Sequence, residues 1–137
     1  MIEKAIGIAL NAHAGQVDKA GDPYIFHPLR VMLQMQSENE KLAAILHDVI
    51  EDSEVTLDDL RAAGFPELVI EAVDLLTHKD SDSYEAYLAR IKPNPLSRAV
   101  KLADLGDNSR LERIKSPSEK DFSRIEKYKL AIAYLLS

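Results

Sequence analysis

Four ionisable side chains stand close together in the segment LHDVIED, residues 46–52. The four are His47, Asp48, Glu51 and Asp52. They follow the stretch KLAAIL, whose apolar composition is typical of a buried helix. Residues four apart share one face of a helix, so His47 is predicted to lie above Glu51. The same spacing places Asp48 above Asp52. Because imidazole and carboxylate groups bind metal ions, a helix that ends in this way indicates one wall of a metal site.

Two further polar side chains stand where the helical pattern expects apolar ones. His27 lies at a junction between a loop and a helix, just before Pro28, while Asp104 belongs to an otherwise apolar helical stripe. A buried carboxylate needs a partner, and a shared cation is the simplest partner for all of these groups. This ligand set suits Mn²⁺, Fe²⁺ or Zn²⁺ better than Mg²⁺. The sequence therefore predicts a mixed metal shell made of His27, His47, Asp48 and Asp104.

Composition limits the classes of function. The chain of 137 residues has a hydrophobic share of 46%, which fits one globular domain spanning residues 1–137. It contains no Cys, so disulfides and thiolate metal sites are excluded. The net charge of −6 argues against binding to nucleic acid or to an anionic membrane surface, since both depend on positive charge. A small anionic ligand fits if a metal ion and local basic side chains supply the positive field.

The beginning of the chain carries no targeting signal that we can identify. MIEKAIGIAL contains Glu3 and lacks the apolar run of a signal peptide. No stretch approaches the roughly 20 apolar residues of a membrane span. We therefore expect a cytoplasmic protein.

Apolar residues recur at helical spacing along the chain, and no stretch alternates in the way of a strand. The pattern predicts an all-α, compact single domain of about eight helices. The first helix is predicted to end at Gly15, and the seventh to run from Leu96 to about Arg113. Periodicity also places Leu33 and Leu68 on the buried sides of their helices.

Capping signals locate several helix starts. A Ser or Thr followed three residues later by Asp or Glu can close the first turn of a helix with two reciprocal hydrogen bonds. This pattern occurs in Ser37 with Glu40, Thr56 with Asp59 and Ser118 with Asp121, and Asp82 with Glu85 is expected to cap the sixth helix.

The order of the predicted metal ligands, H…HD…D, resembles the HD superfamily of metal-dependent phosphohydrolases. Three stretches, HAGQVDKAGDPYIFHP, LHDVIEDS and KLADLGDN, are similar to the hydrolase domain of RelA/SpoT homologues, and the small single-domain alarmone hydrolases fit best. The resemblance covers about residues 1 to 132. It implies an HD-fold helical bundle that hydrolyses the 3′-pyrophosphate of an alarmone such as ppGpp, releasing pyrophosphate and the 5′ nucleotide.

The resemblance also implies roles for single residues. The metal ligands of the family match the four residues predicted above, for one divalent ion, with Mn²⁺ favoured and Fe²⁺ or Zn²⁺ as alternatives. Glu51 and Asp52 match the pair that orients and activates the attacking water, and either carboxylate could accept its proton. The residues expected to contact the nucleotide are Lys19, Tyr24, Lys79, Lys101, Asn108, Arg124 and Tyr128.

Two positions depart from the family pattern. Asp18 stands where the family usually carries an Arg that packs against the base, so the preference between ppGpp and ppApp is open. After Asp104 the family commonly has a basic residue, then Leu and an aromatic residue or His. This chain has Leu105, Gly106 and Asp107, and Asp107 is expected to be solvated.

Two other functions remain alternatives. One is a broader HD phosphohydrolase of the 5′-nucleotidase or NADPH phosphatase type, and the other is a regulator that binds a nucleotide without turnover. The expected partner is a small-molecule nucleotide, not a nucleic acid or a membrane, and the chain could be a monomer or a homodimer. His13, on the apolar side of the first helix, is expected to be a hydrogen-bonded structural residue, with direct ligation as the alternative.

Overall fold

The computed structural model describes residues 1–110 and 116–137. Within these residues the chain is all-α, as predicted, and the one β pairing is an isolated bridge between Val17 and Pro23. None of the described helices is long and apolar enough to cross a membrane. The described helices are α1 (Ile2–Ala12), α2 (Phe26–Leu33), α3 (Glu38–Leu46), α4 (Val49–Asp52), α5 (Leu57–Ala62), α6 (Glu67–Leu76), α7 (Tyr84–Ile91), α8 (Pro95–Asn108) and α9 (Glu119–Leu136).

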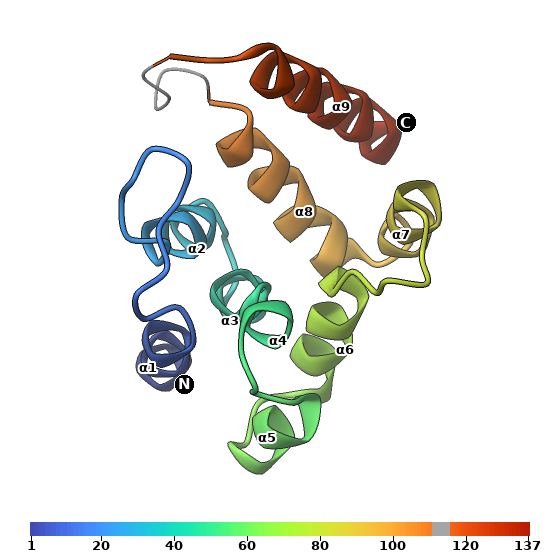
Figure 1. The fold of residues 1–137 in the computed structure, drawn as a ribbon. Coiled ribbons are helices and arrows are strands. Elements are labelled where there is room, and N and C mark those ends of the chain that lie inside the picture. Colours follow the sequence, from blue (N-terminus) through green and yellow to red (C-terminus); the bar gives the residue numbers. More distant parts are fainter. Residues whose placement is uncertain (111–115) are drawn as a thin grey trace.

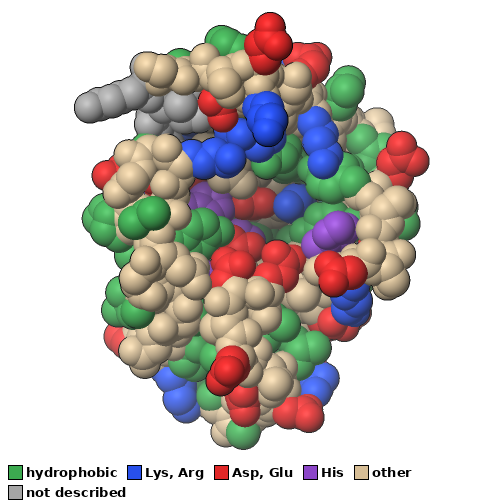
Figure 2. All heavy atoms as spheres, viewed as in Figure 1, with side chains coloured by type: hydrophobic (Ala, Val, Ile, Leu, Met, Phe, Trp, Pro, Cys, Tyr) green, Lys and Arg blue, Asp and Glu red, His purple; other side chains and the backbone are tan. Residues whose placement is uncertain are grey.

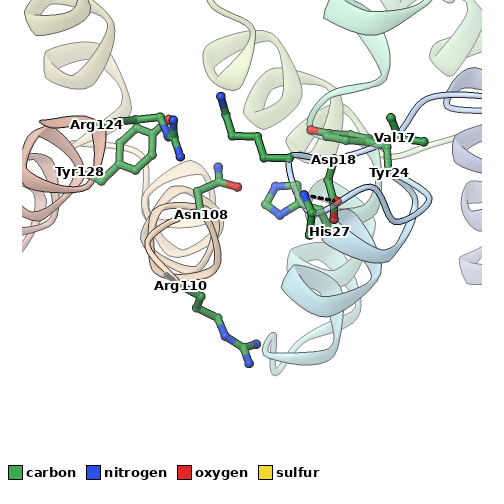
Figure 3. A pocket seen from close by; sticks show the side chains of 10 residues that line it. Val17, Asp18, Tyr24, His27, Asn108, Arg110, Arg124 and Tyr128 are labelled. Carbon is green, nitrogen blue, oxygen red and sulfur yellow. Dashed lines mark hydrogen bonds between the residues drawn. The ribbon is translucent and has the colours of Figure 1, made fainter. Parts of the chain in front are cut away.

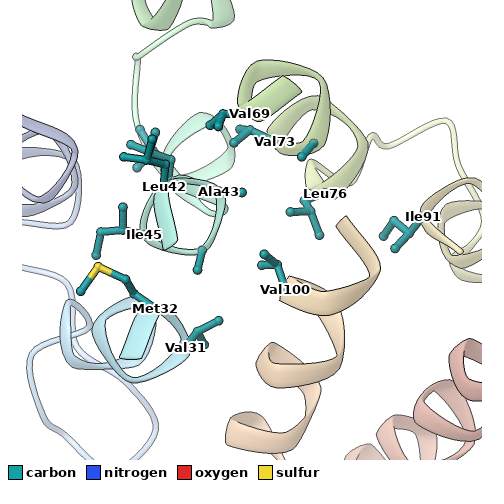
Figure 4. Packing of buried hydrophobic residues seen from close by; sticks show 14 of the residues in the cluster. Val31, Met32, Leu42, Ala43, Ile45, Val69, Val73, Leu76, Ile91 and Val100 are labelled. Carbon is teal, nitrogen blue, oxygen red and sulfur yellow. The ribbon is translucent and has the colours of Figure 1, made fainter. Parts of the chain in front are cut away.

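Helix α3 lies at the centre and packs against α1, α2, α6 and α8 (Figure 1). Helix α8 also contacts α2, α6 and α7, and α9 packs along it. The hydrophobic core lies beside α3. Residues 42–46 are all buried there, and so are side chains from other helices such as Val31, Val73 and Val100 (Figure 4). Full burial of a Val, Leu or Ile side chain contributes about 1.5–3 kcal/mol. This packing fixes α2, α3 and α8, the helices that bring the candidate metal ligands together.

The predicted capping signals agree with the structure except in one case. All three predicted capping boxes are confirmed, with both reciprocal hydrogen bonds present in each. The expected cap of the sixth predicted helix is wrong, because Ser83 is the N-cap of α7 and accepts a hydrogen bond from the backbone of Ala86. Asp82 lies one residue before the cap position and pairs instead with Arg90.

The helix ends show two further differences. Helix α1 ends at Ala12 with His13 as its C-cap, before the predicted end at Gly15, which follows in left-handed backbone geometry with φ of 81°. Helix α8 ends at Asn108, before the predicted end near Arg113, because Ser109 leaves helical geometry with φ of −90° and ψ of 3°. Arg113 itself lies outside the described residues.

Two side chains predicted to be buried are exposed, Leu33 at 75% and Leu68 at 64%. Their neighbours Met32 and Val69, which the same periodicity places on these sides, are buried. The apolar pattern therefore predicts each helix and most of its packed face, but the packed face is narrower than the predicted apolar side. Contacts with neighbouring helices decide how much of an apolar side is covered, and the sequence of the helix does not specify it alone.

Candidate metal centre and active site

The segment that carries the four neighbouring ionisable groups is not one continuous helix. Helix α3 ends at Leu46 and α4 begins at Val49, so His47 and Asp48 form the junction between them. The prediction of a single helix through Asp52 is therefore wrong. At this junction the side chains of His47 and Asp48 approach each other, with 3.0 Å between Nε2 and Oδ2.

The four predicted ligands converge on one point. His27 comes from α2, Asp104 from α8, and His47 and Asp48 from the junction of α3 and α4. One ligand atom from each lies within 4.8 Å of all the others. Oδ1 of Asp104 is 2.7 Å from Nε2 of His27 and 3.3 Å from Nε2 of His47. Two imidazoles and two carboxylates at this spacing form a group that could hold a divalent metal ion.

The electrostatics of the cluster favour a positive charge at its centre. Burial lowers the pKa of His47, but Asp48 and Asp104 outweigh it and hold that pKa well above its ordinary value. Burial raises the pKa of Asp48, yet the adjacent His47 brings it down to about 2. Lys101 and both imidazoles likewise keep the pKa of Asp104 well below its usual range against the effect of burial. A divalent cation would satisfy the same buried carboxylates.

The outer nitrogens of the two imidazoles are already bound. Nδ1 of His47 donates to the carbonyl oxygen of Ala44 at 2.5 Å, and Nδ1 of His27 lies 2.7 Å from Oδ2 of Asp107. A neutral imidazole that donates from Nδ1 presents the lone pair of Nε2. Both Nε2 atoms face the cluster, so the residues fit a metal ion held through the Nε2 atoms.

Three polar side chains hold the carboxylates of the cluster. The hydroxyl of Tyr24 donates to Oδ2 of Asp48. Nζ of Lys101 donates to Oδ2 of Asp104 at 2.9 Å, and Nδ2 of Asn108 donates to Oδ1 at 3.2 Å. Burial, followed by the charge of Asp48, raises the pKa of Tyr24 and keeps its hydroxyl protonated. Each of these three residues, predicted to contact the nucleotide, also bonds to a predicted metal ligand.

Glu51 and Asp52 lie on α4, directly after the cluster. Oε1 of Glu51 accepts a hydrogen bond from the backbone N–H of His78. Oδ2 of Asp52 lies 3.8 Å from Nδ1 of His13. Burial raises the pKa of both carboxylates, and the nearby charge of Asp48 adds to the shift. A carboxylate whose pKa is raised toward the working pH is better matched to accepting a proton.

His13 is buried beneath this region but lies outside the four-residue cluster. Its Nδ1 is 3.0 Å from Oε1 of Gln16, and Nε2 of Gln16 donates to the carbonyl oxygen of Asp52 at 3.1 Å. His13 and Gln16 therefore brace the end of α4 against α1, which fits the structural role expected for His13.

Two cavities open beside the cluster, and Asn108 and Tyr128 line both. Figure 2 shows the hollow, with histidine and acidic side chains on its floor and Lys and Arg side chains on its rim. The first cavity, of about 380 Å³, reaches His27, and Arg124 and Tyr128 of α9 approach it from the side opposite Tyr24 (Figure 3). The second, of about 310 Å³, is lined by Asp48, Glu51, Asp104 and Lys101, with aromatic side chains around them.

The predicted nucleotide contacts fall into three groups. The first cavity is lined by Lys19, Tyr24, Asn108, Arg124 and Tyr128, together with Asp18. Lys101 lines the second cavity with Lys127, which the sequence analysis missed. Lys79 lines neither cavity, and its Nζ lies 3.3 Å from Oδ1 of Asp74. Lys127 stands three residues after Arg124 on α9, so helical spacing would have placed both on nearby faces.

Asp107 is buried in the site, contrary to the expectation from the sequence. It was expected to be solvated, yet it is 2% exposed and contacts His27 of α2. The guanidinium of Arg30 also binds its carboxylate. Asp107 lies three residues after Asp104, as Arg30 lies three after His27, so the spacing carried a signal for a second contact between these helices.

These observations define a helical domain with a buried imidazole and carboxylate centre. The chain is 37% identical over 128 residues to the guanosine-3′,5′-bis(diphosphate) 3′-pyrophosphohydrolase of Vibrio cholerae, in an alignment that covers 82% of this chain and 18% of that protein. It is 34% identical over 125 residues to a GTP pyrophosphokinase of Streptomyces coelicolor, covering 82% of this chain and 15% of that protein. It is 36% identical over 94 residues to the bifunctional (p)ppGpp synthase/hydrolase SpoT of Escherichia coli, covering 62% of this chain and 13% of SpoT. No protein-family model matches the chain.

A solved structure described as a metazoan ortholog of SpoT that hydrolyses ppGpp has the same fold. The TM-score is 0.78 at 22% identity, and the match covers 98% of this chain and 84% of that one. The shared fold is the helical HD fold. Within the HD superfamily the chain belongs to the RelA/SpoT hydrolase group, so the resemblance noted in the sequence is confirmed. The chain spans 18% or less of the length of the curated relatives named here.

Proposed function

We propose that this chain hydrolyses the 3′-pyrophosphate of an alarmone nucleotide of the ppGpp or ppApp type. The observation that carries the proposal is the convergence of His27, His47, Asp48 and Asp104 within 4.8 Å, beside two cavities and next to Glu51. The relatives named as ppGpp 3′-pyrophosphohydrolases support the choice of substrate.

We propose Mn²⁺ as the resident ion, with Fe²⁺ and Zn²⁺ as alternatives, held by the two Nε2 atoms and by the carboxylates of Asp48 and Asp104. Mixed imidazole and carboxylate ligands favour these ions over Mg²⁺. When bound, such an ion supplies Lewis acidity that polarises a phosphate and lowers the pKa of water. Lys101 and Asn108 keep the Asp104 carboxylate oriented for this task through bonds of 2.9 and 3.2 Å.

The reaction joins the oxygen of water to the phosphorus next to the ribose and breaks the bond from that phosphorus to the 3′ oxygen. The water loses one proton, and the 3′ oxygen gains one as pyrophosphate leaves. Glu51 or Asp52 accepts the proton of the water, since burial raises the pKa of both. Glu51 lines the second cavity beside Asp48, whereas Asp52 pairs with His13.

The walls of the cavities supply the charge that a highly anionic nucleotide needs. Lys19 and Arg124 line the first cavity, and Lys101 and Lys127 line the second. In a chain with a net charge of −6, this local positive charge would counter repulsion between the protein and the phosphates. Arg124 is suited to the phosphates, because its planar guanidinium can bind two oxygens at once.

One observation favours ppApp as a second candidate substrate. Asp18 lines the first cavity, where the family usually has an Arg. Its Oδ1 accepts hydrogen bonds from the backbone N–H groups of Ala20, at 2.9 Å, and Asp22, at 3.0 Å. An Asp cannot stack on a purine as an Arg plane does, so the preference for guanine that such stacking supports would be weakened.

The decisive experiment uses the chain of residues 1–137, which we propose folds as one domain, with Mn²⁺ and one of ppGpp, ppApp, NADPH or GTP. Pyrophosphate release from ppGpp or ppApp, lost on chelation and restored by Mn²⁺, supports the proposal. Cleavage only at the 2′ phosphate of NADPH or the 5′ phosphates of GTP would replace it with a broader phosphohydrolase. Tight binding of ppGpp with no product would assign the chain to the class of silent regulators.

A further inference from the structure

The two histidines of the cluster are oriented by different kinds of partner. Nδ1 of His47 donates to a backbone carbonyl, that of Ala44, within its own helical turn. Nδ1 of His27 faces a side chain, the carboxylate of Asp107, at 2.7 Å across the contact between α2 and α8. The orientation of His27 therefore depends on a residue that can be substituted, and that of His47 does not.

Asp107 is itself held rigidly. Arg30 binds both of its oxygens, with Nε 2.8 Å from Oδ1 and Nη2 3.0 Å from Oδ2. A guanidinium that bonds a carboxylate through two parallel N–H groups fixes the plane of the carboxylate as well as its position. The side chain of Asp107 is 1% exposed, so water cannot readily take the place of either partner.

The spacing of these residues on α2 and α8 allows α8 to hold the His27 ring through both of its nitrogens. His27 and Arg30 are three residues apart on α2, and Asp104 and Asp107 are three apart on α8, so each pair lies on one face of its helix. Nε2 of His27 meets Asp104, while Nδ1 meets Asp107. The imidazole is thus fixed between two carboxylates of the same helix.

We propose that Asp107, held by Arg30, is the positioning residue that sets the tautomer and ring orientation of His27 and so tunes metal affinity. A carboxylate that accepts the Nδ1 proton directs the Nε2 lone pair into the cluster and makes the imidazole a stronger ligand. The inference rests on the metal centre of the proposed function. It adds a residue that has no counterpart among the predicted ligands, bases and nucleotide contacts.

The test is the Mn²⁺ dissociation constant of metal-free protein, measured by isothermal titration calorimetry. Asp107→Asn keeps the size of the side chain but weakens both contacts, and we expect it to bind Mn²⁺ about 10- to 100-fold more weakly. The Mn²⁺ concentration for half-maximal activity should rise by the same factor, with kcat largely restored at saturating Mn²⁺. The matched control is Asp58→Asn, which removes an exposed carboxylate that pairs with Arg61 at 2.8 Å and should leave the affinity unchanged.

Arg30→Lys gives an independent second variant, since it keeps the positive charge but loses the planar fork and leaves Asp107 in place. We expect Arg30→Lys to lose less Mn²⁺ affinity than Asp107→Asn. The double variant should lose less than the product of the two single losses, because both substitutions act on the contact between Asp107 and His27. If Asp107→Asn does not fold, as judged by its melting curve, Arg30→Lys decides alone. Wild-type affinity in every folded variant would overturn the inference and leave the proposed function intact. No Mn²⁺ binding by the unmodified protein would instead overturn the metal centre.

Discussion

The backbone N–H of His78 donates a hydrogen bond to Oε1 of Glu51, joining the segment after α6 to α4. The segment that carries His78 is itself fixed by Arg90, which donates to the carbonyl oxygen of Thr77 at 2.8 Å and pairs with Asp82. One oxygen of Glu51 is thereby held by protein, while the side chain lines the second cavity beside Asp48. This bond fixes Glu51 at the wall of the cavity in which the proposed reaction takes place.

Glu51→Gln should reduce kcat by about 100-fold or more while the Mn²⁺ dissociation constant stays within a few-fold of the unmodified value. Gln can still accept the bond from His78 but cannot take up a proton. Stopped assays at saturating Mn²⁺ give kcat, and calorimetry gives the affinity. Asp52→Asn, tested in parallel, decides which carboxylate is the base, because the larger loss of kcat marks it. The control is Glu54→Gln, a change at an exposed glutamate on the segment after α4. Full activity in both the Glu51 and Asp52 variants would contradict the assignment.

The acid limb of the rate profile should lie at a higher pH than an ordinary glutamate would give. Burial, together with the charges of Asp48 and Asp52, raises the pKa of Glu51 above 4.5, although the bond from His78 and the charge of Lys101 act in the other direction. A base works only when deprotonated, so kcat/KM should be full above this raised pKa and fall as the pH decreases through it. The measurement is kcat/KM at constant ionic strength and saturating Mn²⁺. An acid limb centred at or below pH 4.5 would contradict the raised pKa of Glu51.

The raised pKa of Glu51 restricts the activity of the base to higher pH, but it stabilises the fold at lower pH. A carboxylate whose pKa is higher in the folded state stabilises the fold at low pH, and this contribution is lost as the pH rises through the folded pKa. Glu51→Gln cannot ionise, so we expect metal-free Glu51→Gln to be more stable than the unmodified chain at pH 7 and to show no such advantage below pH 4. Urea unfolding at the two pH values measures the difference. Equal stability at pH 7 would argue that the site tolerates the charge without cost.

Metal binding should stabilise the fold. An ion that binds only the folded state contributes about 2.7 kcal/mol at a concentration 100 times its dissociation constant. We expect a clear rise of the melting temperature with Mn²⁺ and a smaller one with Mg²⁺, both reversed by a chelator. His47→Gln removes one imidazole and should abolish most of the Mn²⁺ effect. An unchanged rise in that variant would place the bound ion elsewhere.

Gly106→Ala should raise the free energy of unfolding by about 1 kcal/mol, since Ala is the better helix former. Gly106 lies within α8 with an exposed position, and a Cβ there would meet nothing within 4 Å. The structure therefore gives no packing reason for this glycine. Gly64→Ala is the contrasting variant and should lower stability, because Gly64 has φ of 93°. Urea unfolding of both proteins tests the pair, and a loss of stability in Gly106→Ala would contradict the expectation.

Much of this structure could be predicted from the sequence, because the signals that locate the helices are local. Capping boxes and apolar periodicity depend on residues within one or two turns, and they located the helices and most of their starts. Polar residues on apolar faces likewise identified the four groups that the structure brings together around Asp104, although their role as ligands stays a prediction. Leu33 and Leu68 were misplaced because the packed face of a helix depends on its neighbours.

The unexpected features all depend on contacts between distant segments. The partner of Asp107 is His27, 80 residues away, and the only local sign of this contact is that Asp107 lies three residues after Asp104. The junction at His47 and Asp48 was missed for a related reason. The residues around it favour a helix, and the chain leaves the helix where two polar side chains face His27 and Asp104.

The junction between α3 and α4 bears on any attempt to build this motif into a designed protein. Adjacent residues of an unbroken helix point about 100° apart, so a His-Asp pair placed on a straight helix would aim only one side chain at an ion. A scaffold meant to carry the pair must end one helix before it and begin another after it, with the backbone of the Asp near φ of −105° and ψ of 0°, as for Asp48 here. A design therefore has to reproduce the backbone turn between the two helices as well as the His-Asp pair.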